Sequence, residues 1–97
     1  MPTYIVLGTF TDQGIRNVKD SPKREDAFRS LCGTVGAQVR DVYRTMGRYD
    51  LAAVIEAPDD VTMSAIAYSL GSAGNVRTET LRAFSRQETD TALAKML

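Results

Sequence analysis

The chain has 97 residues with 12 basic and 12 acidic side chains, no histidine, no tryptophan and one cysteine. Without histidine, the sequence excludes a Ser-His-Asp triad, a Cys-His dyad and any zinc or haem site with a histidine ligand. A single cysteine excludes an internal disulfide and any CxxC redox or metal pair, which is typical of a reducing cytoplasm. We therefore expect one cytoplasmic domain over residues 1–97, with no leader segment and no membrane-spanning run.

Charge is balanced overall but unevenly distributed along the chain. Residues 16–48 contain eight basic and four acidic side chains, whereas residues 50–60 contain four acidic side chains and no basic one. Charges of both signs keep a small domain soluble. Binding to nucleic acid needs a clear basic excess, so we expect no nucleic-acid partner.

The first half of the chain predicts a strand, a helix and a second strand. Residues 4–10 (YIVLGTF) are rich in β-branched and aromatic residues and end at a turn over residues 11–14. Residues 14–18 predict an extra turn packed by Ile15 and Val18. Ser21 and Pro22 predict the start of a helix that ends at Gly36. Its core-facing stripe comprises Phe28, Leu31, Cys32 and Val35. A strand over residues 38–46 follows, with Val39, Asp41, Tyr43 and Thr45 expected on one face and Arg40, Val42, Arg44 and Met46 on the other.

The second half predicts a strand, a helix, a fourth strand and a short tail. A tight connection at Gly47 and Arg48 leads into a largely apolar strand over residues 49–57. Asp59 and Asp60 are expected to cap and charge the start of the next helix, which ends at Gly71. Its stripe comprises Met63, Ile66, Ala67 and Leu70. Residues 76–84 form the fourth predicted strand. Residues 85–88 (SRQE) match a capping box, which predicts a terminal helix carrying Ala92, Leu93 and Met96.

The resulting β-α-β-β-α-β order predicts an α+β, ferredoxin-like fold with a four-stranded antiparallel sheet and a short C-terminal helix. The first and third strands read as continuous apolar runs, as expected of central strands buried on both faces. Two helices can cover only one face of such a sheet, and the tail is too short to cover the other. A second copy packed sheet to sheet is the simplest cover, so we expect a homodimer, with assembly into a larger homo-oligomer left open.

Three segments together resemble a known family. They are a Gly-x-Tyr-Asp element at residues 47–50, Pro2-Thr3-Tyr4 near the start, and residues 74–82 (GNVRTETLR) before the tail. Over residues 2–84 the chain resembles the small bacterial GYD-domain family. The resemblance implies a ferredoxin-like domain of the dimeric α+β barrel type, without an established activity. Relatives by fold include haem-degrading and quinone-forming monooxygenases, lactone isomerases and ligand-binding domains of leucine-responsive regulators, and fold alone does not choose among them.

The candidate catalytic residues lie around the hairpin between the second and third strands. They are Tyr43, Tyr49, Asp50 and Arg44. Tyrosine offers a phenolic proton and arginine a fork for an anion. The alternative is structural: Tyr49 and Asp50 lock the hairpin or contact a partner, with Asp50 accepting hydrogen bonds from backbone groups or from Arg48. Gly47 is expected to take a positive φ at this turn or to allow a close approach of the chain.

A second set of candidates could bind an anionic ligand. It comprises Asn75, Arg77 and Arg48. Strand alternation places Arg77 and Glu79 on one face and Arg82 on the other, so ion pairing along the edge strand is the competing interpretation. Cys32 falls on the apolar stripe and is expected to be buried. No ligand spacing predicts a metal site, and we expect no cofactor.

Two hypotheses of function remain. The first is a homodimeric module that binds a small molecule or plays a structural role through sheets packed face to face. The alternative is a cofactor-independent enzyme, a monooxygenase or isomerase acting on an aromatic or lactone-like substrate. An RNA-recognition module is excluded because the third strand lacks the stacking aromatics that it needs.

Overall fold

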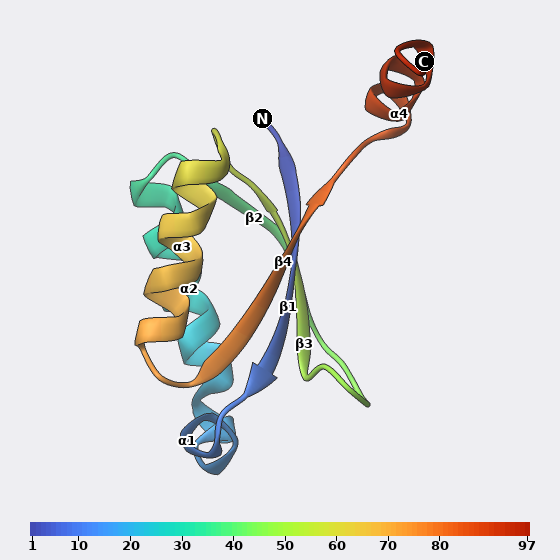
Figure 1. The fold of residues 1–97 in the computed structure, drawn as a ribbon. Coiled ribbons are helices and arrows are strands. Elements are labelled where there is room, and N and C mark those ends of the chain that lie inside the picture. Colours follow the sequence, from blue (N-terminus) through green and yellow to red (C-terminus); the bar gives the residue numbers. More distant parts are fainter.

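A four-stranded antiparallel sheet with helices on one face forms the body of the protein (Figure 1). The computed structural model describes all residues 1–97. The strands are β1 (Thr3–Phe10), β2 (Gln38–Arg44), β3 (Leu51–Glu56) and β4 (Val76–Ala83). The helices are α1 (Asp12–Arg16), the 3-10 turn η1 (Val18–Asp20), α2 (Ser21–Thr34), α3 (Asp60–Ser72) and α4 (Arg86–Ala94). The sheet order β2-β3-β1-β4 confirms the ferredoxin-like arrangement, with the two apolar strands at its centre.

The core lies between the sheet and helices α2 and α3. Alternate residues of the central strands point to these helices and are buried, among them Val6 of β1 and Ile55 of β3. They pack with Cys32 of α2 and with Met63 and Ile66 of α3. Cys32 is fully buried, as expected, and burial raises the pKa of its thiol to about 11.

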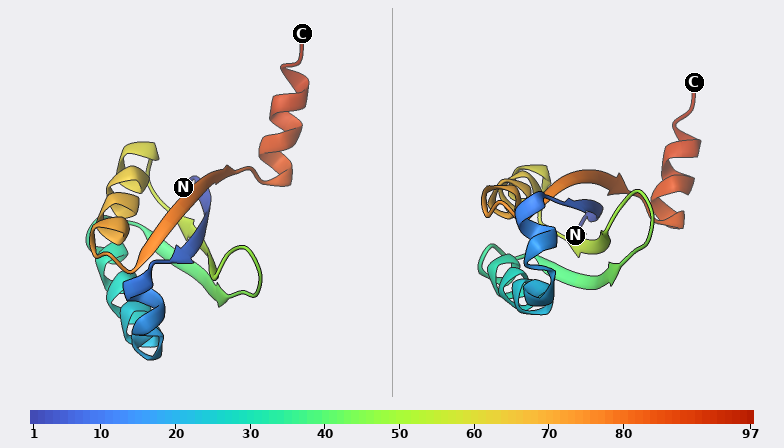
Figure 2. Two further views of the ribbon diagram at one scale, coloured as in Figure 1. Left: turned by 60° about the horizontal axis from the view of Figure 1, so that its bottom comes forward. Right: turned by 90° about the horizontal axis from the view of Figure 1, so that it is seen from below.

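The opposite face of the sheet carries no helix, as the views in Figure 2 show. We call this surface the open face. Its central row joins Val54, Ile5 and Leu81, because Ile5 pairs with Val54 of β3 and with Leu81 of β4. The next row contains Tyr43, Ala52, Leu7 and Glu79. The open face is therefore apolar at its centre and polar at its margins.

A β-bulge in β2 changes which side chains face the helices. The register shifts between Val39 and Asp41, so Arg40 has no partner of its own in β3. Val39, Val42 and Arg44 consequently face the helices, whereas Asp41 and Tyr43 belong to the open face. The alternation expected for residues 38–46 is therefore wrong at Val39, because the extra residue places Val39 on the same face as Val42 and Arg44.

Several expected helix contacts also differ from the structure. Leu31 and Val35 are exposed rather than in the core, and after Gly36 the chain turns so that Ala37 is buried instead of Val35. The extra turn before α2 exists, but it buries Gly14 and leaves Ile15 exposed. On α3, Asp59 caps the first turn as expected.

Strand ends and caps differ by a few residues. β2 ends at Arg44 and β3 begins at Leu51, so Tyr49 and Asp50 lie in the hairpin loop and not in a strand. Ser21 makes no capping bond, because η1 continues directly into α2 at this point. Its hydroxyl is buried and contacts β2 instead.

Helix α4 extends away from the body and buries none of its side chains in its own chain (Figures 1 and 2). The predicted capping box is present, with the Ser85 hydroxyl accepting from the Glu88 amide at 3.1 Å and the Glu88 carboxylate accepting from the Ser85 amide at 3.0 Å. Leu93 is 58% exposed and Met96 is 73% exposed. The tail is thus a well-capped helix whose apolar side chains have no partner.

Candidate functional site

The Gly-x-Tyr-Asp loop is fastened to the end of β1 by Asp50. The Asp50 carboxylate accepts a hydrogen bond from the Phe10 amide at 2.8 Å, and the Asp50 amide donates to the Gly8 carbonyl at 2.8 Å. The Thr45 amide donates to the Asp50 carbonyl at 2.9 Å and closes the loop. Gly47 has φ +95°, as the turn requires. The Asp50 carboxylate thus accepts a hydrogen bond from a backbone group, as one of the two interpretations expected.

Tyr49 reaches from this loop to β4. Its hydroxyl donates to the Glu79 carboxylate at 2.7 Å, and this bond to a carboxylate raises the pKa of Tyr49. The Arg48 guanidinium lies 5.6 Å from the centre of the Tyr49 ring. The loop is therefore bent across one end of the open face, and its tyrosine connects the β2–β3 hairpin to β4 at the far edge of the sheet.

The four candidate catalytic residues do not meet in one site. Tyr43 is 60% exposed on the open face, opposite Ala52. Arg44 faces the helices, and Asp50 is committed to the backbone of β1. Because the sheet separates Arg44 from Tyr43 and from the Tyr49–Glu79 contact, no single substrate can reach all four groups.

The candidate ligand-binding residues are also dispersed. Arg77 is exposed on the open face opposite Thr9, and Arg48 lies on the hairpin loop. Asn75 precedes β4 and faces a cleft on the helix side of the sheet. Of all the expected site residues, only Arg44 and Asn75 line the same cleft.

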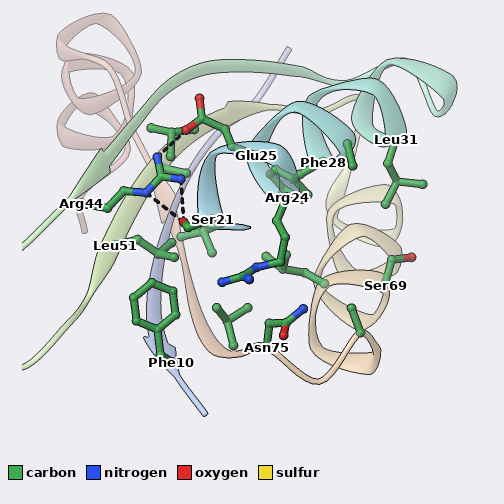
Figure 3. Close-up of a pocket in the computed structure, with 17 residues that line it drawn as sticks. Phe10, Ser21, Arg24, Glu25, Phe28, Leu31, Arg44, Leu51, Ser69 and Asn75 are labelled. Carbon is green, nitrogen blue, oxygen red and sulfur yellow. Dashed lines mark hydrogen bonds and ion pairs between the residues drawn. The ribbon is translucent and has the colours of Figure 1, made fainter. Parts of the chain in front are cut away.

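That cleft lies between α2, α3 and the sheet and has a volume of about 270 Å³ (Figure 3). Eleven of its 17 lining residues are hydrophobic. Apolar side chains from β1, β3 and α2 form much of its wall, including Phe10, Leu51 and Phe28. We call this space the α2–α3 cleft.

A polar cluster from α2 and β2 occupies one side of the cleft. The Arg44 guanidinium donates to the Ser21 hydroxyl, from Nη2 at 2.7 Å and from Nε at 3.2 Å, and it pairs with Glu25. Glu25 also accepts from Arg29 Nε at 3.1 Å. The hydrogen bond from Arg44 lowers the pKa of Glu25 most, and the hydrogen bond from Arg29 lowers it further. The Glu25 carboxyl is therefore ionised at neutral pH.

Arg24 is the other cation of the cleft, and it has no carboxylate partner. Its Nη1 donates to the Asn17 carbonyl at 2.9 Å and its Nη2 to the Gly14 carbonyl at 3.5 Å. In Figure 3 the side chain leaves α2 and extends into the space above Asn75 and Phe10. The cleft therefore holds two guanidinium groups and one carboxylate.

Sequence reasoning missed Ser21, Arg24 and Glu25 as site residues, although the sequence carries a signal for Ser21 and Glu25. Residues 21, 25, 28 and 32 follow the i, i+4, i+7, i+11 spacing of one helix face. Phe28 and Cys32 were assigned to that face, so the same spacing places Ser21 and Glu25 toward the sheet. Polar residues at the start of a core-facing stripe indicate a polar site at that end of the helix.

A separate polar pair lies at the start of α3. The Tyr4 hydroxyl donates to Asp60 at 2.5 Å, and the Tyr4 ring is almost fully buried. The bond to Asp60, followed by burial, raises the pKa of Tyr4 to about 12. The Arg82 guanidinium lies 5.7 Å from the centre of the same ring. This pair joins β1 to the first turn of α3, which indicates a structural role.

Tyr4→Phe should lower the free energy of unfolding at pH 8 by about 1.5–3 kcal/mol, the usual range for a hydrogen bond to a charged group. Because the pKa of Tyr4 is raised on folding, the bond contributes fully below pH 10 and is lost as the pH rises toward 12. Urea unfolding of both proteins at pH 8 and pH 11 measures this effect. The difference in free energy of unfolding between the two proteins should be smaller at pH 11 than at pH 8. A difference that stays constant or increases would contradict the assignment.

Comparison with known proteins identifies the family. The family model described as "GYD domain" matches residues 4–93. The chain belongs to the GYD domain family. It is 38% identical over 84 residues to the "Glutamine synthetase and cystathionine beta-lyase binding protein" of Thermus thermophilus, covering 86% of this chain and 88% of the relative. The resemblance carried by the loop, the N-terminal segment and β4 is thereby confirmed.

A solved structure agrees with the fold of this GYD-domain protein. The crystal structure of TTHA0845 from Thermus thermophilus matches it with a TM-score of 0.57 and 29% identity, covering 88% of this chain and 95% of that chain. No helix of the GYD-domain protein combines the length and apolar character needed to cross a membrane. No group of three or more Cys, Asp or Glu side chains is placed to hold a metal ion.

Proposed function

We propose that this GYD-domain protein is a homodimer that binds another protein, with the open face as the dimer interface. The observation that carries the proposal is the uncovered apolar row of Val54, Ile5 and Leu81. An exposed apolar sheet face of this kind is unfavourable in water. A second copy of the chain can bury it, because the same face on the two copies is self-complementary.

The size of the open face supports a dimer in which α4 takes part. Four strands about 4.8 Å apart, with about seven residues of 3.4 Å rise, give a footprint of roughly 450 Å². A stable interface buries about 800 Å² on each partner. Because α4 projects beyond the sheet with Leu93 and Met96 exposed, it is placed to supply part of the difference by packing on the second copy.

Binding is favoured over catalysis by the dispersal of the candidate groups. A monooxygenase or isomerase of the kind considered above would need Tyr43, Tyr49, Asp50 and Arg44 around one substrate. These groups lie on two faces or are held by backbone groups. The relative from Thermus thermophilus is named for binding two enzymes, which supports a protein partner for this chain as well.

The outer surface of α3 is the surface that we propose for the protein partner. Val61 is 79% exposed and Tyr68 is 78% exposed, two helical turns apart on the side that faces away from the sheet. Tyr68 follows the buried Ile66 by two residues and therefore points away from the sheet. An exposed tyrosine beside an aliphatic residue is typical of an interface anchor.

Light scattering and a binding assay together test the proposal. In light scattering, the protein at micromolar concentration should have twice the 10.6 kDa mass of one chain. In the binding assay, glutamine synthetase and cystathionine β-lyase from the same organism are immobilised separately. At least one of the two enzymes should bind the chain with Kd below about 10 µM. Tyr68→Ala should weaken that binding about tenfold, whereas Ser30→Ala at an exposed position of α2 should not. A stable monomer would contradict the dimer, and no binding to either enzyme would contradict this choice of partner.

A further inference from the structure

The α2–α3 cleft has the dimensions of a site for a small ligand. Its volume is about 270 Å³. At about 30 Å³ for each water molecule in the liquid, this space matches a ligand of roughly ten non-hydrogen atoms. The walls are mostly apolar with a few polar groups at one side, which is the usual composition of a small-molecule site.

The apolar part of the cleft is open to solvent at Leu31. This side chain is exposed although it lies on the α2 stripe with Phe28 and Cys32. Leu31 and Phe28 border the cleft from α2, and Leu51 and Phe10 border it from the sheet (Figure 3). A hydrocarbon chain or small ring between these side chains would remove their apolar surface from water.

The polar part has more hydrogen-bond donors than acceptors. Glu25 is the one carboxylate, and it is occupied by Arg44 and Arg29. Arg24 uses two of its five N–H groups on backbone carbonyls. The Asn75 side-chain oxygen accepts from Gln13 at 3.1 Å, so the Asn75 amide presents its NH₂ group as a donor without a protein acceptor. A ligand that completes this arrangement must supply an acceptor and a negative charge.

We propose that the α2–α3 cleft binds a small apolar monocarboxylate, with the carboxylate on Arg24 and Asn75 and the apolar body between Phe28 and Leu51. Charge selects one carboxylate, because Glu25 is already paired and Arg24 is the one cleft-lining cation without a carboxylate partner. The cleft is on the helix side of the sheet, opposite the open face. The proposal is therefore independent of dimer formation and of protein binding.

Calorimetric titration of the full chain with octanoate tests the proposal, since octanoate has about the size that the cleft admits. Octanoate should bind at neutral pH with Kd below about 1 mM, and 1-octanol, which lacks the charge, should bind at least about tenfold more weakly. Amide NMR shifts on adding octanoate should be largest at Arg24, Phe28 and Asn75. Equal binding of octanol would overturn the role of the charge.

Matched variants locate the site. Arg24→Gln should weaken octanoate binding at least about tenfold, while Lys23→Gln, which removes an equal charge from the neighbouring exposed position, should change it less than about twofold. Ala53→Leu adds bulk to the floor of the cleft and should abolish binding. Equal losses at Arg24 and Lys23 would overturn the proposal, as would NMR shifts outside the cleft or no octanoate binding to the unmodified chain.

Discussion

Ile5→Glu should convert the proposed dimer into monomers. Ile5 stands at the centre of the open face, between Val54 and Leu81. In a symmetric sheet-to-sheet dimer, the new carboxylate would be buried without a cation and would face its own copy. A buried unpaired charge costs about 3–5 kcal/mol, so the dissociation constant should rise by more than about 100-fold. Light scattering and sedimentation over a range of protein concentrations measure the change.

Val61→Glu is the matched control for this experiment. It places the same charge at an aliphatic position, but on the outer surface of α3, where Val61 is already 79% exposed. We expect the mass of this variant to equal that of the unmodified protein. The open face is not the interface if Ile5→Glu keeps the dimer mass, or if Val61→Glu dissociates the dimer equally well.

Gly14→Ala should destabilise the fold by about 3 kcal/mol, near the upper end of the range for overpacked sites. A Cβ atom at this position would lie 1.9 Å from the backbone oxygen of Asn75. That oxygen already accepts from the Thr11 amide at 3.0 Å, which joins the start of α1 to the loop before β4. Neither backbone segment can move without breaking this bond. For a domain of this length, the loss corresponds to a fall of roughly 15 °C in Tm.

Gly33→Ala is the control for Gly14→Ala. Gly33 lies inside α2, and a Cβ atom there would meet no neighbour within 4 Å. Alanine in an exposed helical position is favoured over glycine by about 0.5–1 kcal/mol, so this variant should be more stable. Urea unfolding at one fixed protein concentration compares the two variants. Similar changes in both would show that steric contact at Asn75 is not the cause.

The strand order was predictable because burial on two faces leaves a direct mark on the sequence. The apolar runs of β1 and β3 have no alternation, and the structure places both strands in the centre. The capping box at Ser85, the cap at Asp59 and the turn at Gly47 were predictable for a related reason, since each depends on residues close together in the sequence.

The candidate site was harder to predict because it depends on one backbone irregularity. Nothing in residues 38–46 marks Arg40 as the bulged residue, yet the bulge determines that Arg44 faces α2 and that Tyr43 faces away. The α2–α3 cleft also combines both helices, the α3–β4 loop and all four strands, and the distances between these elements cannot be read from sequence spacing. The expected packing of α2 against the sheet leaves no room for a cleft. In the structure, Leu31 borders the cleft instead of filling it.

Because α4 is isolated from the body of the protein, its own chain does little to stabilise it as a helix. A helix of nine residues is too short to be stable in water by its own hydrogen bonds, and this one buries no side chain in its own chain. We therefore expect this helix to become stable when it packs on a partner surface. If that partner is a second copy, folding of the tail and assembly are a single coupled process, and the helical content of the protein rises with its concentration.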